Sequence, residues 1–78
     1  MNPPYGREIN RWMKKAYESA LAMAPGSAEI NYNLGLLYVD LKQYDRAVKV
    51  AQKAYELGHP LPGLRNRLKR VGHWPENG

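Results

Sequence analysis

The residues that could carry out chemistry in this chain are few and scattered. The two histidines, His59 and His73, have no cysteine and no paired carboxylates at metal-ligand spacing, so we expect turn residues rather than a metal site. Ser27 precedes a helical pattern and is expected to cap it, and no nucleophile motif surrounds Ser27 or Ser19. No glycine-rich turn between a strand and a helix is present to hold a phosphate. We therefore expect no catalysis, no cofactor and no metal.

A basic cluster near the C-terminus offers a second kind of chemistry, the binding of phosphate groups. His73 and Trp74 follow it, and cations beside an aromatic ring are what a site for phosphates and stacked bases needs. The cluster is short and no recognised nucleic-acid-binding module surrounds it, so we favour a solvated helix face and disfavour nucleic acid as the partner. The four cations of the cluster are Arg65, Arg67, Lys69 and Arg70.

Length and composition bound the remaining possibilities. The 78 residues allow one small domain, and the formal net charge of +5 favours acidic partners. The chain has no cysteine, so redox chemistry does not fix its compartment, although a soluble, cytoplasmic protein is favoured. No apolar run approaches the roughly 18 residues that span a bilayer, and the first residues lack the apolar core of a signal peptide.

Four amphipathic patterns predict an all-α fold. Pro25-Gly26 ends the first pattern, a polar break at Lys42-Gln43 separates the second from the third, and Gly58 ends the third. We expect helices at residues 7–24, 28–41, 44–57 and 63–71. Together they form one domain, 7–71, between an extended lead-in at 1–6 and a flexible tail at 72–78 that Trp74 could anchor.

The first of these helices is expected to bury one apolar stripe and to turn its charged residues, including Glu18, toward water. Trp12 lies at the edge of this stripe. The residues of the stripe are Ile9, Met13, Ala16, Tyr17, Ala20, Leu21 and Ala24.

Residues 28–57 carry small and aromatic residues at fixed spacing. In particular, Gly35 and Ala47 are small where two antiparallel helices would touch. The positions that we expect to form helix contacts are Leu34, Gly35, Tyr38, Ala47 and Ala54. With Tyr44, these positions follow the pattern of a tetratricopeptide repeat, and the stretch resembles that family. The chain departs from the pattern at Asn31, Ala51 and Pro60.

The resemblance extends beyond one repeat. Ala20 and Ala54 are 34 residues apart, which is the period of the family, so the first helix resembles the second helix of a preceding repeat. The last helix, through Leu64 and Leu68, is expected to cap the stack on helix 44–57. The resemblance thus implies an antiparallel helical hairpin stack of about one and a half repeats and a capping helix.

The resemblance also implies where a partner would bind. In this family the first helices of successive repeats line a concave groove that holds a peptide or a partner helix. Carried over to this chain, the groove positions are Glu29, Tyr32, Leu36, Val39 and Asp40. The function implied is that of a protein-interaction scaffold or adaptor. A structural C-terminal cap of a longer repeat protein and a small basic nucleic-acid-binding domain remain as alternatives.

This chain has only one helix of the kind that lines the groove, the first helix of a repeat, at residues 28–41. Its apolar stripe, formed by Tyr32, Leu36 and Val39, is therefore expected to be covered by another polypeptide. For the isolated chain we favour a homodimer that pairs through this stripe.

Overall fold

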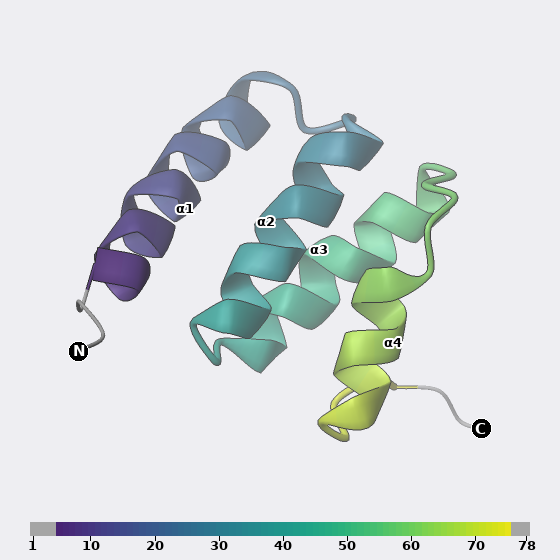
Figure 1. The fold of residues 1–78 in the computed structure, drawn as a ribbon. Coiled ribbons are helices and arrows are strands. Elements are labelled where there is room, and N and C mark those ends of the chain that lie inside the picture. The colour runs from purple at the N-terminus through teal and green to yellow at the C-terminus, as the bar shows by residue number, and fades with distance from the viewer. Residues whose placement is uncertain (1–4, 76–78) are drawn as a thin grey trace.

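Four helices account for most of the chain in the computed structural model, which describes residues 5–75 and the side chains from residue 8 onward. They are α1 (Tyr5–Met23), α2 (Ala28–Asp40), α3 (Tyr44–Glu56) and α4 (Gly63–Arg70). The described residues contain no strand. Figure 1 shows α2 between α1 and α4, with α3 behind the gap between α2 and α4. The prediction of an all-α helical hairpin stack is confirmed.

The helix limits differ from the predicted ones at the N-terminus. Helix α1 begins at Tyr5, so the expectation of an extended lead-in is wrong for Tyr5 and Gly6, and residues 1–4 lie outside the described part. The helix continues through Gly6 to Tyr5, although glycine is a poor helix former. At the other end, Gly72–Pro75 are described and the remainder of the expected tail, 76–78, is not.

Short hydrogen-bonded caps set the directions of the helices. Ser27 Oγ accepts a hydrogen bond from the Ile30 N–H at 3.1 Å and begins α2. Two residues beyond the ends of α2, α3 and α4, the backbone has positive φ: Lys42 at 60°, Gly58 at 92° and Gly72 at 78°. After each, the next N–H bonds back to the helix, as in His59 N–H to Ala54 C=O at 3.0 Å. This is the Schellman arrangement, and it fixes the sharp turns between the helices.

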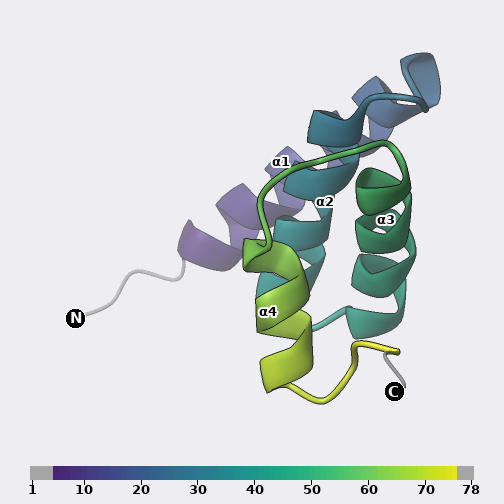
Figure 2. The same ribbon diagram turned by 90° about the vertical axis from the view of Figure 1, so that its right-hand side faces the viewer.

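The core lies where α2, α3 and α4 meet. The side chains of Ala47, Ala51 and Ala54 in α3 have no exposed area, and neither have those of Leu64 and Leu68 in α4. Figure 2 shows α4 lying alongside both α2 and α3. Because three of these residues are alanines, the helix axes can approach closely, and the two leucines fill the remaining space.

Gly35 is a point of close contact between α2 and its neighbours. A Cβ atom added there would collide with Leu64 Cδ2 and lie 3.3 Å from Val50 Cγ2. The nearest atoms therefore belong to α4 and to Val50, and not to Ala47 as the sequence pattern suggested. Gly35 is small because a leucine from the capping helix fits against it.

Helix α1 is much less buried than the sequence predicted. It contacts α2 and no other helix of the described chain. Tyr17 and Leu21 are half-buried against the core, whereas Ile9, Met13 and Ala16 of the predicted buried stripe are exposed. The expectation of one buried stripe is therefore wrong for Ile9, Met13 and Ala16, and also for Ala24, which lies just beyond the end of α1 and is exposed. A helix with a single neighbour can bury only the residues that face that neighbour.

Candidate interaction surface

The structure separates the five predicted groove residues into two groups. Tyr32 and Val39 are each only 7% exposed, so they belong to the core. Glu29 and Asp40 are exposed, and Leu36 is half-buried. The expectation that the apolar stripe of α2 needs another polypeptide to cover it is wrong for Tyr32 and Val39, because this chain covers them itself.

The segment between α3 and α4 covers Tyr32. The ring of His59 stacks on the Tyr32 ring with 3.8 Å between centroids and 6° between planes, and the Tyr55 ring meets it edge-on. The Tyr32 hydroxyl accepts a hydrogen bond from the Leu64 N–H at 3.2 Å, and Gly63 leaves room for that hydroxyl. Tyr32 thereby satisfies a backbone donor at the start of α4 that would otherwise lack a partner.

An ion pair joins the last residue of α2 to the middle of α4. Arg67 Nη2 donates to Asp40 Oδ1 at 2.7 Å, and the two side chains are 39% and 40% exposed. Such an exposed pair contributes about 0–1 kcal/mol, so it orients α4 more than it stabilises the fold. Asp40 therefore lies at the end of α2 with one of its carboxylate oxygens already hydrogen-bonded to Arg67.

Four of the accessible residues of α2 lie along one narrow strip. Glu29, Asn33, Leu36 and Asp40 follow one another at steps of four, three and four residues, so they share one face of the helix. We call these four residues the open face of α2. Leu36 supplies its apolar centre, and the two carboxylates stand at its ends.

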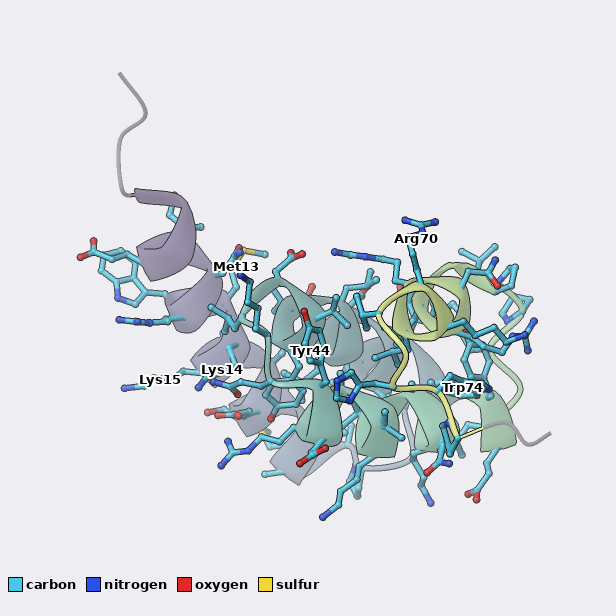
Figure 3. All side chains as sticks on the ribbon, turned by 90° about the horizontal axis from the view of Figure 1, so that it is seen from below. Met13, Lys14, Lys15, Tyr44, Arg70 and Trp74 are labelled. Atoms are coloured by element: carbon cyan, nitrogen blue, oxygen red, sulfur yellow. The ribbon has the colours of Figure 1, made fainter. Side chains whose placement is uncertain are left out.

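The basic cluster of α4 is largely engaged within the molecule. The Arg65 guanidinium lies 5.3 Å from the centre of the Tyr55 ring, in cation–π geometry, and Arg67 pairs with Asp40. Arg70 is exposed and points away from the helices in Figure 3. Arg65 and Arg67 are thus directed to side chains within this molecule and not to one open surface.

The aromatic residues after α4 also pack inward. The Trp74 ring meets the Tyr55 ring edge-on at 6.0 Å, and the His73 ring lies 4.5 Å from that of Tyr44. Trp74 is half-buried against the core, where the sequence suggested an anchor. These contacts place Gly72–Pro75 along α3, and they occupy the rings that a base-stacking site would need.

One polar contact between α1 and α2 was missed at the sequence level. The Tyr38 hydroxyl donates a hydrogen bond to Glu18 Oε2 at 2.6 Å, so Glu18 belongs to the α1–α2 interface and not to the solvated face. Burial, together with the bond to the Glu18 carboxylate, raises the pKa of Tyr38 to about 12. The repeat pattern marked Tyr38 as a contact position but did not show which residue it meets.

Other kinds of site find little support in the described chain. Residues 5–75 contain no group of three His, Asp or Glu side chains that could hold a metal ion. No helix within them is long and apolar enough to cross a membrane. Two hollows, of about 320 and 150 Å³, flank the α2–α3 turn, and Lys42 and Gln43 line both of them.

Comparison with known families agrees with this architecture. The family model described as tetratricopeptide repeat matches residues 14–56, which is more than half of the chain. Comparison with curated proteins and with solved structures found no match. Tetratricopeptide repeats generally act as non-enzymatic modules that mediate protein–protein interaction. The match covers the end of α1 and the whole α2–α3 hairpin, and the chain belongs to the tetratricopeptide repeat family.

Proposed function

We propose that this chain is a protein-interaction module that binds a partner without catalysing a reaction, and that the partner contacts the open face of α2. The observation that carries the proposal is the selective exposure of this face. Internal packing buries Tyr32 and Val39 but leaves Glu29, Leu36 and Asp40 in contact with solvent. These three are the predicted groove positions at which a partner can still reach the helix.

The chemistry of the open face defines the kind of partner. Leu36 offers apolar area at the centre, and Glu29 offers an exposed carboxylate in the first turn of the helix. A peptide or helix that places one apolar side chain on Leu36 and one cation near Glu29 fits this arrangement. Asp40 contributes less, because Arg67 already occupies one of its oxygens.

The alternatives rest on weaker observations. Pairing of two copies through Tyr32, Leu36 and Val39 loses two of its three contact residues to the core. Nucleic-acid binding by the α4 cluster loses Arg65 and Arg67 to internal partners. The role of a C-terminal cap in a longer repeat protein is supported by the complete burial of the apolar residues of α4, and it is compatible with the proposed binding face.

Selection from a phage-displayed library of random peptides tests the proposal. We expect peptides that bind in the micromolar range and carry a cation beside an apolar residue. Leu36→Lys and Glu29→Lys should each weaken their binding at least tenfold, as measured by fluorescence anisotropy. The matched control is Leu61→Lys, because Leu61 is an exposed apolar residue outside the face. A selection that yields no specific peptide contradicts the interaction function. Peptides that bind both variants as well as the parent contradict the assigned face.

A further inference from the structure

Helix α4 borders the open face of α2 and adds to the surface that a partner would meet. Arg67 of α4 donates to Asp40, which is the last residue of the open face, so the two helices meet at this end. Earlier in α4, the Leu64 N–H bonds to the Tyr32 hydroxyl in the first half of α2. The order of these two contacts means that α4 runs beside α2 in the same direction, as Figure 1 also shows. The accessible surface therefore continues from α2 onto α4.

Arg70 is the cation that α4 contributes to this surface. It lies three residues after Arg67, so the two arginines share one side of α4. The Arg70 side chain is exposed and points away from the helices in Figure 3. Among the described side chains, Arg67 is held by Asp40 and Arg65 by the Tyr55 ring, whereas no hydrogen bond or ion pair engages Arg70. Its charge is therefore accessible to a partner.

Opposite charges stand at the two ends of the combined surface. Glu29 lies in the first turn of α2, and Arg70 lies beyond Asp40 at the other end. Asp40 and Arg67 neutralise each other, so Glu29 and Arg70 set the charge at the two ends. Leu36 lies between them and is the one apolar residue of the open face. A surface with one charge of each sign around an apolar position distinguishes the two orientations of a charged partner.

We propose that the partner is a short extended segment with a Lys or Arg at the Glu29 end, an apolar side chain on Leu36 and an Asp or Glu at the Arg70 end. This inference rests on the proposed function and specifies its partner. At a rise of about 1.5 Å per residue, Leu36 lies about 10 Å from Glu29 along α2 and about 6 Å from Asp40. An extended chain rises about 3.3 Å per residue, so the cation belongs about three positions to one side of the apolar residue. The acid belongs about two to three positions to the other side.

The composition of the open face favours an extended segment over a partner helix. A helix lying along about 16 Å of α2 would present apolar residues at several successive turns. The open face offers these residues only Leu36, because Asn33 and the two carboxylates are polar. One apolar contact between two charged contacts needs only the few side chains that a short extended chain supplies.

Charge reversal at Arg70 tests the orientation, with the peptides selected on the parent protein as probes. Arg70→Glu should weaken their binding about fivefold in fluorescence anisotropy at low salt, because attraction to the acid becomes repulsion. Arg70→Gln, which removes the charge without reversing it, should weaken binding about twofold. A peptide in which Lys replaces the acid should bind Arg70→Glu better than it binds the parent. The matched control is Lys53→Glu, which makes the same charge reversal in the last turn of α3 and should leave binding unchanged.

The outcomes separate this inference from the proposed function. Peptides that require Leu36 and Glu29 but bind both Arg70 variants as well as the parent would overturn the orientation and leave the interaction module intact. Selected peptides without an acid on the side opposite their cation would do the same, and so would a Lys-substituted peptide that still prefers the parent. A selection that yields no specific peptide would contradict the proposed function and this inference together.

Discussion

The first and last helices are integrated into the molecule in opposite ways. Helix α4 has eight residues and buries Leu64 and Leu68 completely, whereas α1 has 19 residues and none of its described side chains is buried to that degree. The difference follows from their neighbours, because α4 contacts both α2 and α3 and α1 contacts α2 alone. In a repeat stack, the number of neighbouring helices therefore decides how much a helix contributes to the core, and its length does not.

The test with the largest expected effect on stability truncates one apolar side chain in each of the two helices. Leu64→Ala should lower the free energy of unfolding by about 2–5 kcal/mol, because it leaves a cavity beside Gly35. Met13→Ala in α1 should cost less than about 1 kcal/mol, because Met13 is exposed and leaves no closed cavity. Urea unfolding of both variants measures the difference. Equal losses would mean that α1 belongs to the core as fully as α4 does.

A second test concerns the polar contact that holds α1 to α2. The pKa of Tyr38 rises from 10.0 to about 12 in the folded protein. The contribution of neutral Tyr38 to the free energy of unfolding is therefore complete below pH 10 and is lost as the pH rises from 10 to 12. A shift of two units corresponds to at most roughly 2–3 kcal/mol. We expect the parent to lose more stability than Tyr38→Phe between pH 9 and pH 12 in urea unfolding. Identical losses in the two proteins would show that the folded structure does not raise the pKa of Tyr38.

A third test sharpens the account of the contact between α4 and α2. Gly35→Ala places a methyl group against Leu64 and Val50, which costs roughly 1–3 kcal/mol by overpacking and regains up to about 1 kcal/mol in helix preference. We expect a net loss of about 1–2 kcal/mol by thermal or urea unfolding. Gly26→Ala is the control, because nothing lies within 4 Å of a Cβ atom there. A gain in stability from Gly35→Ala would mean that α4 packs less closely than the structure shows.

The smallest expected effect comes from the turn between α2 and α3. Lys42 adopts a φ of 60°, a conformation that costs most L-residues about 1–2 kcal/mol and that glycine adopts freely. Lys42→Gly should therefore raise the free energy of unfolding by about 1 kcal/mol. The reverse change, Gly58→Ala at a φ of 92°, should lower it by a similar amount. Two changes of the same sign would indicate that the caps are not equivalent.

Sequence reasoning predicted the helices well because their signals are local. Pro25-Gly26, Ser27 and Gly58 mark helix ends through backbone conformation and capping, which neighbouring residues determine. The fold class and the repeat family follow from these marks and from the spacing of the small residues in α2 and α3. Lys42 carried no such signal, because lysine has no preference for positive φ.

The candidate site was harder to predict because burial is not local. Tyr32 and Val39 match the groove positions of the family, yet both lie in the core, and residues more than 20 positions away along the chain cover Tyr32. The apolar stripe of α1 has the periodicity of a buried face, but the burial of this stripe depends on how many helices surround α1. Periodicity shows which residues share a face, and only the assembled structure shows what covers that face.

Native-state hydrogen exchange tests the contrast between α1 and the α2–α4 core most directly. We expect the amides of α4 near Leu68 to exchange only through global unfolding, together with those of α3 around Ala51. The amides of α1 around Ala20 should open at a clearly lower free energy. Protection of α1 equal to that of α3, or exchange of α4 ahead of α1, would contradict the account.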